Sequence, residues 1–254
     1  MQPVRSLAGF PEPFDLETGL LEKIAALIAP GVAIERGEGQ AIISRDSEIL
    51  EQLLQGSNHE PAIRLWVNHQ CLVTTAAVAR KKEFVEACQQ AELWGWPVHV
   101  RASGGSTIVH RPGILNISLF QSGEGLSSSL GAAYQSLTGI LVSALGALGI
   151  HADTGPVPGC YCDGQYNVRV KGRRIAGTAC HRKNRGERYA QVLHAAMLVS
   201  GDLQTDMDIV SRFERLLGID RCYAADACRS IEMVLALDFD QIAASQLALD
   251  GEVE

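Results

Sequence analysis

The chain has 254 residues, of which 46% are hydrophobic and 20% charged, so it can bury the core of one large domain. Its net charge of −7 argues against a nucleic-acid-binding surface, and it contains neither a run of eighteen apolar residues nor an apolar secretory leader. Seven cysteines, an odd number scattered along the chain, are typical of a reducing compartment. We therefore expect a cytoplasmic protein with no nucleic-acid or membrane partner.

The first hundred residues predict alternating helices and strands. Apolar residues at helical spacing predict a helix over 14–29, and a second helix is expected near 45–55. Residues 62–67 and 71–75 predict two short strands that pair around a turn at 68–70. A helix over 80–93 should then lead into a strand over 98–101. We expect the sheet of the protein to begin with these strands.

A glycine-rich stretch follows at 101–113, with the sequence RASGGSTIVHRPG. It predicts a strand, a turn at Gly104-Gly105 and a short return strand, followed by a strand over 114–120. Such a turn usually belongs to an ordinary hairpin. The alternative is a binding loop, because exposed N–H groups of the two glycines, together with Arg101, Ser103 and Ser106, could hold an anion or a carbonyl oxygen.

The second half predicts a long helix over 126–150, where small residues are interleaved with leucine, and a hairpin with strands over 166–170 and 173–179 and a turn at Lys171-Gly172. The basic run at 181–188 is interpreted as an exposed loop, with contact to an anionic partner as the alternative, and a strand is expected over 189–200. Helices are predicted over 205–217, 224–237 and 240–249. This order predicts one α+β domain over 1–254, with a central mixed or antiparallel sheet flanked by helices and a helical extension from about 205 to 254.

Two cysteines stand directly before the basic hairpin. Cys160 and Cys162 lie in a polar loop with Gly159, Asp163 and Gly164. A cysteine becomes a nucleophile where positive charge favours its thiolate, which nearby arginines and histidines could supply. Their one-residue spacing, without a second cysteine pair, is a poor match to a zinc site, so we expect no metal. The alternative is that both are inert buried thiols.

Two segments resemble motifs of the biotin/lipoate protein ligase family. The sequence RASGGSTIVHRPGILNIS at 101–118 is similar to its Arg-x-Ser-Gly-Gly motif with a following His and Leu-Asn, and GRRIAGTA at 172–179 is similar to its Gly-x-Lys-Ile-x-Gly-Ser-Ala motif. The resemblance covers roughly residues 60–205 and implies the α+β catalytic fold of that family. It also implies these acyl- and ligand-binding residues: Arg101, Ser103, Gly104, Gly105, His110, Asn116, Gly177, Thr178 and Ala179.

Within that family, the segment YCDGQYN at 161–167 most resembles the Tyr-Cys-Pro-Gly-x-Tyr-Asp segment of the cysteine-dependent octanoyl amidotransferases. This resemblance implies that Cys162 carries the acyl group as a thioester, with Cys160 as the alternative nucleophile. The implied activity moves an octanoyl or lipoyl group to a lysine of a lipoyl-domain protein, such as a glycine cleavage H-type protein or an E2 subunit, with no permanently bound cofactor. Two alternatives stay open: an ATP-dependent lipoate-protein ligase, and a catalytically silent homologue that binds a lipoyl domain or an acyl ligand.

The chain departs from the family motif at Arg174, where the motif carries a lysine that holds the acyl carbonyl. Arginine also offers charge and hydrogen bonds to a carbonyl oxygen, so we assign Arg174 to this role, although the two side chains are not equivalent. Lys171 lies at the predicted turn and is expected to point to solvent. For the general base, His110, His181 and His194 are all candidates.

Overall fold

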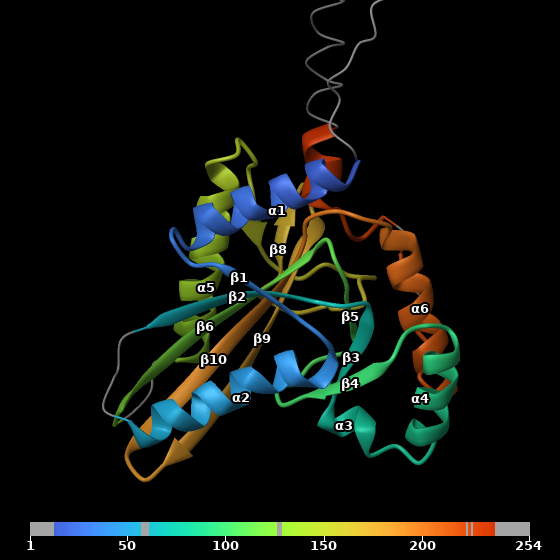
Figure 1. The fold of residues 1–254 in the computed structure, drawn as a ribbon, viewed down its shortest axis with the longest axis horizontal. Helices are drawn as coiled ribbons and strands as arrows, with labels where there is room; N and C mark the ends of the chain where they lie inside the picture. The colour runs from blue at the N-terminus through green and yellow to red at the C-terminus, as the bar shows by residue number, and fades with distance from the viewer. Residues whose placement is uncertain (1–12, 57–60, 126–128, 222, 225, 237–254) are drawn as a thin grey trace, which may run out of the picture.

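The computed structural model describes residues 13–56, 61–125, 129–221, 223–224 and 226–236. It contains a seven-stranded sheet and a three-stranded sheet, with helices on both faces of the larger one (Figure 1). This arrangement confirms the predicted α+β class with a mixed sheet flanked by helices. None of the helices within the described ranges is long and apolar enough to cross a membrane.

The larger sheet contains both parallel and antiparallel strand pairs. In spatial order its strands are β1 (Ile34–Gly37), β2 (Ala62–Asn68), β6 (Ile114–Glu124), β10 (Arg188–Leu198), β9 (Arg173–Arg185), β8 (Val168–Val170) and β7 (Asp153–Thr154). The β1–β2 pair is parallel and the other neighbours are antiparallel. The predicted hairpin between β8 and β9 is confirmed: Lys171 (φ 48°) and Gly172 (φ 75°) both have positive φ, as a type I′ turn requires. Lys171 is exposed at this turn, as expected.

The smaller sheet has β3 (Cys71–Thr75) at its centre, between β4 (Val98–Arg101) and β5 (Ile108–His110). Two predictions are therefore wrong. The strands before and after 68–70 do not pair, because β2 joins β6 in the larger sheet while β3 enters the smaller one. The glycine-rich stretch is not a hairpin, because β4 and β5 bind opposite edges of β3 and Gly104-Gly105 lies in the loop between them. Every residue of β3 is buried, as is typical of a central strand.

The two faces of the larger sheet pack against different helices. Alternate residues such as Leu65, Leu115 and Leu193 lie in the core cluster that includes α1 (Pro13–Ile28) and α5 (Leu130–Gly146). The opposite face lies under α2 (Gly39–Gln55), whose Ile42, Ile43, Leu50 and Leu54 pack on Trp66, Phe120 and Val192. The predictions of α1 and α5 are confirmed. Helix α2 begins six residues earlier than expected, where the Asn68 side chain accepts a hydrogen bond from the Gly39 N–H at 2.8 Å.

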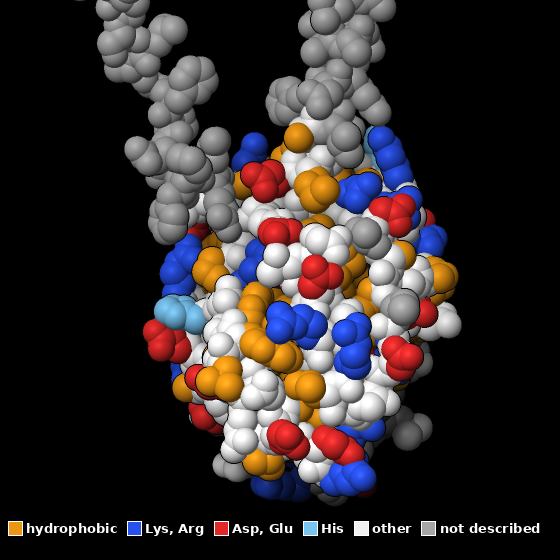
Figure 2. All heavy atoms as spheres, turned by 90° about the vertical axis from the view of Figure 1, so that its right-hand side faces the viewer, with side chains coloured by type: hydrophobic (Ala, Val, Ile, Leu, Met, Phe, Trp, Pro, Cys, Tyr) orange, Lys and Arg blue, Asp and Glu red, His pale blue; other side chains and the backbone are white. Residues whose placement is uncertain are grey.

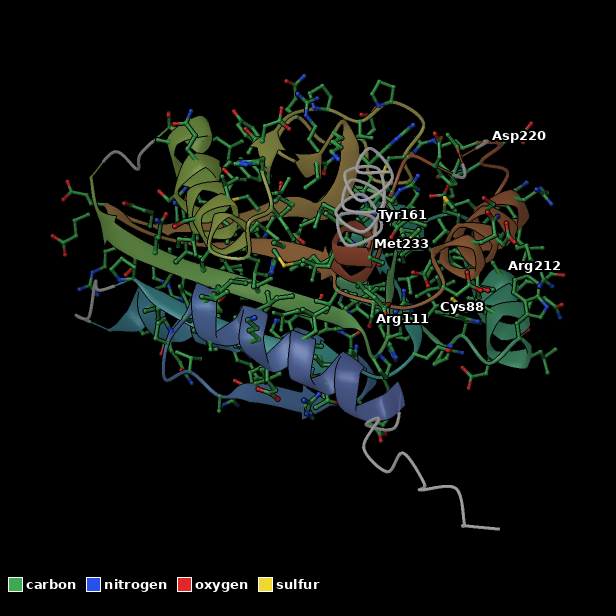
Figure 3. The ribbon with its side chains drawn as sticks, turned by 90° about the horizontal axis from the view of Figure 1, so that it is seen from above. Cys88, Arg111, Tyr161, Arg212, Asp220 and Met233 are labelled. Carbon is green, nitrogen blue, oxygen red and sulfur yellow. The ribbon has the colours of Figure 1, made fainter. Side chains whose placement is uncertain are left out.

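At the far end of the smaller sheet, helix α4 (Phe84–Leu93) packs against α6 (Leu203–Leu216), and a short helix α3 (Ala76–Ala79) precedes them. Figure 3 labels Cys88 on α4 and Arg212 on α6, and the Arg212 guanidinium lies 4.1 Å from the centre of the Trp94 ring. The face that carries these helices mixes hydrophobic side chains with charges of both signs (Figure 2). Exposed hydrophobic residues here include Val85 and Leu93 of α4.

Two predictions in the second half are corrected. The basic run at 181–188 belongs to β9 and the start of β10 rather than to a loop, and its Lys183 and Arg185 form ion pairs with Glu51 of α2. The helix predicted over 224–237 is helical only from 231 to 236 in the described chain, because residues 227–229 instead exchange backbone hydrogen bonds with Arg174. The helix predicted over 240–249 lies outside the described residues.

Candidate active site

A cavity lies between α2, the β3–β5 side of the smaller sheet and the larger sheet. It holds about 740 Å³ of space between protein atoms, including its open mouth. Each residue that the sequence predicts for acyl or ligand binding lines it, namely Arg101, Ser103, Gly104, Gly105, His110, Asn116, Gly177, Thr178 and Ala179. Cys162 lines it too, whereas Arg174 and Cys160 are not among the lining residues.

Small residues on two neighbouring strands form one wall of the cavity. Gly177 of β9 pairs with Ala196 of β10, and Ala179 pairs with His194, so these four positions share one face of the sheet. The absence of a side chain at Gly177 is what lets the sulfur approach. A Cβ atom added there would lie 3.0 Å from the Cys162 Sγ and 2.7 Å from a terminal nitrogen of Arg174. The thiol and the Arg174 guanidinium therefore lie close together in the space that a side chain at Gly177 would occupy.

The glycine-rich loop is held by the side chain that precedes it. Arg101 donates hydrogen bonds to the backbone oxygens of Val73 at 2.9 Å, Gly104 at 3.1 Å and Ser106 at 2.6 Å. Desolvation lowers the pKa of Arg101 to about 10, which leaves it charged at neutral pH. These hydrogen bonds hold the loop and occupy donors of Arg101. The arginine therefore contributes mainly its positive charge to the cavity.

The glycine-rich loop also contacts the cysteine loop directly. The Ser106 hydroxyl donates to the Tyr161 backbone oxygen at 2.6 Å, next to Cys162. The Asn167 amide donates to the Cys162 backbone oxygen at 2.7 Å, and the Thr178 hydroxyl donates to the Tyr166 backbone oxygen at 2.9 Å. The glycine-rich loop and the cysteine loop thus form one connected structure. The Ser106 hydroxyl is used in a hydrogen bond that joins them.

Four polar atoms around the cavity are buried without a hydrogen-bond partner: Ser103 Oγ, His110 Nδ1, Asn116 Nδ2 and His181 Nε2. Buried polar groups in folded proteins nearly always have partners, so their gathering here is typical of a site that binds a polar group. Burial, with the nearby Arg101 charge, lowers the pKa of His110 to about 3, so this imidazole is neutral at physiological pH. No group of three or more His, Cys, Asp or Glu in the described ranges is placed to hold a metal ion.

Arg174 lies behind the cavity wall and is only 1% exposed. Its guanidinium lies 4.1 Å from the centre of the Tyr161 ring, and its Nε and one Nη have no hydrogen-bond partner. The Cys160 and Cys228 sulfurs are 3.6 Å apart in the same cluster. A hydrogen bond from Cys160, reinforced by the charge of Arg174, lowers the pKa of Cys228 to about 6, and the same hydrogen bond with burial raises the pKa of Cys160. A thiol with a raised pKa, outside the cavity, is poorly placed as a nucleophile.

Two polar residues that the fold brings to this region were not predicted from the sequence. One is Cys228, which lay in a predicted helix. The other is Asp46 of α2, which lines the cavity although only 4% of it is exposed. Burial by itself would raise the pKa of Asp46, but the hydrogen bonds and charges of His194, Ser118 and Arg64 outweigh it and lower the pKa. Asp46 was not predicted because it belongs to no motif. In the sequence it looks like an ordinary surface carboxylate of an amphipathic helix.

The family model for the lipoyl protein ligase A/B catalytic domain matches residues 42–242, so the chain belongs to this family. A relative from Kyrpidia tusciae, named octanoyl-[GcvH]:protein N-octanoyltransferase, is 34% identical over 145 residues, covering 54% of this chain and 46% of the relative. An uncharacterized protein of Cupriavidus necator is 31% identical over 188 residues, covering 68% and 73% of the two chains. The chain spans about half the length of the octanoyltransferase relatives that it matches.

Solved structures of lipoate-protein ligases share this fold. Lipoate-protein ligase A bound with ATP has a TM-score of 0.52 at 18% identity, covering 76% of this chain and 88% of that chain. A bipartite lipoate protein ligase from Thermoplasma acidophilum, studied with its E2 lipoyl domain, has a TM-score of 0.53 at 18% identity, covering 81% and 79%. At this level of identity the likeness shows the fold alone.

Proposed function

We propose that this protein is a cysteine-dependent acyltransferase that moves an octanoyl or lipoyl group, through a thioester on Cys162, to a lysine of a lipoyl-domain protein. One observation carries the proposal: the Cys162 thiol lines a cavity together with the glycine-rich loop and several unpartnered polar atoms. A cysteine nucleophile divides a difficult acyl transfer into two easier steps. The names of the octanoyltransferase relatives support the same reaction class.

The cavity has separate surfaces for the two parts of an acyl group. Ile43, Trp66, Val73 and Ile108 provide apolar contact for a hydrocarbon chain. The carbonyl would lie near Cys162, where the loop N–H groups and the Ser103 hydroxyl are possible donors. Arg101 and Arg174 both interact electrostatically with Cys162 and would stabilise the negative charge that develops on the carbonyl oxygen. Arg174, which is not among the lining residues, would act through its charge from beside Gly177 and Cys162.

For the donor and acceptor we propose lipoyl-domain proteins of the glycine cleavage H type or E2 subunits. The names of the octanoyltransferase relatives mention GcvH, and one structural neighbour was studied with its E2 lipoyl domain. The transfer needs no bound cofactor, and ATP would be required only by a ligase. We further propose that the chain acts as one catalytic domain with a helical extension from about 205, and that it works in the cytoplasm, where a nucleophilic thiol stays reduced.

Intact-mass spectrometry after mixing with an octanoylated lipoyl-domain protein tests this function. Wild type and Cys160→Ala should each gain one octanoyl group, and Cys162→Ala should gain none. The cysteine at 160 is a matched control, because it lies two residues away but outside the cavity. Labelling of Cys162→Ala would overturn the assignment. Acyl-dependent release of pyrophosphate from ATP would favour a ligase, and binding of lipoyl domains without any adduct would favour a silent homologue.

A further inference from the structure

The proposed donor bond is an amide, and this places a chemical demand on the cavity. When the C–N bond breaks, the lysine nitrogen must receive a proton, because an unprotonated amide nitrogen is a very poor leaving group. Arginine does not release its proton at physiological pH, so neither Arg101 nor Arg174 meets this demand. Cys162 is consumed as the nucleophile. Among the residues described around the cavity, the histidines are the side chains suited to carry a proton at neutral pH.

Three histidines line the cavity, and their surroundings differ. His110 is 4% exposed, and its pKa of about 3 keeps it neutral. Burial and the charge of Lys183 lower the pKa of His181, and its Nε2 has no partner. His194 is the one whose ring nitrogen faces a carboxylate, with its Nδ1 3.0 Å from the Asp46 Oδ2. A carboxylate at Nδ1 fixes the ring and leaves Nε2 as the nitrogen that can exchange a proton with a substrate.

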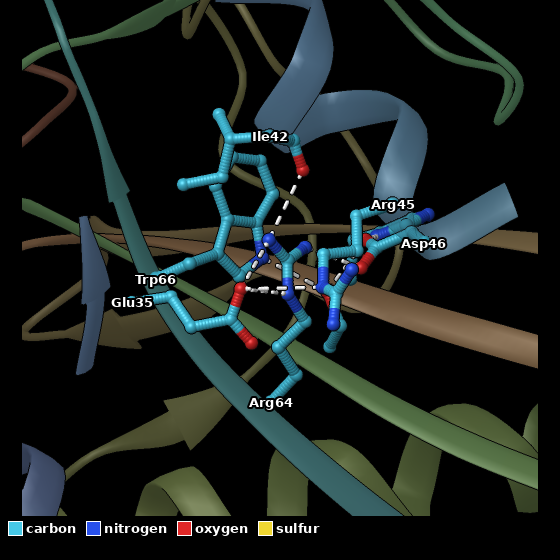
Figure 4. A network of polar contacts seen from close by, with 8 residues as sticks. Glu35, Ile42, Arg45, Asp46, Arg64 and Trp66 are labelled. Atoms are coloured by element: carbon cyan, nitrogen blue, oxygen red, sulfur yellow. Dashed lines mark hydrogen bonds and ion pairs between the residues drawn. The ribbon is translucent and has the colours of Figure 1, made fainter. Parts of the chain in front are cut away.

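The carboxylate of Asp46 is itself held on several sides. Its Oδ1 accepts from Arg64 at 2.7 Å, and its Oδ2 accepts from the Ser118 hydroxyl at 2.6 Å. Arg64 is fixed in turn by Glu35, at 3.0 Å from both Nε and Nη2, and by the backbone oxygen of Ile42 at 3.1 Å. Figure 4 shows Arg64 between Glu35 and Asp46 in this network. These hydrogen bonds therefore hold the Asp46 carboxylate in one orientation, with its Oδ2 facing His194.

The strand register places His194 near the reacting sulfur. Ala196 pairs with Gly177, which is where Cys162 Sγ approaches the sheet, and His194 is two residues from Ala196 on the same face. Gly177 and His194 are therefore diagonal neighbours, whose Cα atoms typically lie about 7–8 Å apart. This spacing leaves room for a substrate nitrogen between the imidazole and the sulfur.

We propose that His194, positioned by Asp46, carries the proton between Cys162 and the lysine nitrogens in the acyl transfer; this rests on the proposed function. In the first step Nε2 takes the thiol proton as the S–C bond forms, and gives it to the donor nitrogen as the C–N bond breaks. In the second step Nε2 takes a proton from the acceptor amine as the new N–C bond forms, and returns it to the sulfur as the S–C bond breaks. His194 would touch the reacting atoms, and Asp46 is a positioning residue.

The test compares two acyl donors in single-turnover acylation of Cys162. An octanoylated lipoyl-domain protein must release an amine, which needs a proton, whereas octanoyl-coenzyme A releases a thiolate, which does not. In His194→Gln the ratio of the amide rate to the thioester rate should fall about 100-fold, the lower end of general acid–base effects. In Asp46→Asn the same ratio should fall about tenfold, a part of that effect. Thermal unfolding would check that both variants fold.

The matched control is His69→Gln. His69 also faces a carboxylate, with Nδ1 3.3 Å from Glu38, but both side chains are exposed and outside the cavity. Its rate ratio should equal that of wild type. An unchanged ratio in folded His194→Gln would overturn the inference, even if both rates fell; if that variant does not fold, the ratio in Asp46→Asn decides in the same way. Failure of wild type to react with either donor would instead remove the proposed function on which the inference rests.

Discussion

Two buried arginines, Arg111 and Arg174, have contrasting partners. Arg111, 8% exposed, donates from Nε and one Nη to the Asp206 carboxylate of α6 at 2.8 and 2.7 Å, and to two backbone oxygens. Arg174, 1% exposed, stacks on Tyr161 beside two thiols, and no ion pair links it to a carboxylate within the described chain. A charge that is paired locally stabilises architecture. A charge that no carboxylate pairs acts on the thiols around it, and here these include Cys228 and Cys162.

The largest expected effect is the loss of folding stability when Arg111 is replaced by methionine. Arg111→Met leaves Asp206 buried without its partner, which should lower the free energy of unfolding by about 3–5 kcal/mol. Denaturant unfolding monitored by circular dichroism would measure this loss. Arg212→Met, on the exposed side of α6, removes only the contact with Trp94 and should cost about 1 kcal/mol or less. Equal losses in the two variants would contradict a structural role for the Arg111–Asp206 pair.

Arg174→Met should behave in the opposite way. The counter-charge of Arg174 is the Cys228 thiolate rather than a carboxylate, and replacing this arginine by an apolar side chain of similar length should change the free energy of unfolding by less than about 1 kcal/mol. The neighbouring Cys228 can take up a proton when the charge is removed, so no buried anion is left behind. Acylation of Cys162 should nevertheless slow about 100-fold, as expected when a group that stabilises a developing oxyanion is lost. A destabilisation as large as that of Arg111→Met, with unchanged acylation, would reverse the comparison.

A further difference concerns the pH dependence of stability, to which Arg174 contributes through Cys228. Cys228 has a pKa of about 6 in the folded protein, against an ordinary value of 9.0. Between these pH values the unfolded chain holds a proton at this thiol that the folded protein has released, so stability should rise as pH increases through this window and be lost as pH falls through 6.

Unfolding midpoints measured from pH 5.5 to 9 would show whether this rise occurs in wild type. Cys228→Ser and Arg174→Met should both reduce it, because the first removes the thiol and the second removes the charge that favours its thiolate. Cys88→Ser is the control, since burial raises the pKa of Cys88 and no arginine favours its ionisation. A rise of the same size in Cys228→Ser would assign the pH dependence to another group.

Sequence patterns correctly predicted the elements whose structure depends on residues close together in the chain. The alternation around Lys171-Gly172 identified the hairpin because the turn needs two residues with positive φ. The resemblance to the family motifs at 101–118 and 172–179 identified residues that line the cavity. The pairing of β3 was not predictable, because Asn68 looks like a turn residue but instead binds Gly39 of α2. Asp46 and Cys228 were missed for a related reason: their partners lie far away in the sequence, and their own segments carry no distinctive pattern.

The backbone of Arg174 forms hydrogen bonds with residues that lie much later in the chain. Its N–H donates to the Ala227 oxygen at 2.8 Å, and its oxygen accepts from the Arg229 N–H at 2.9 Å. The residues that line the cavity all precede position 197. During translation, the cavity-lining residues therefore leave the ribosome before the segment around 227–229. The backbone of Arg174 can gain these two hydrogen-bond partners only after that segment has also emerged.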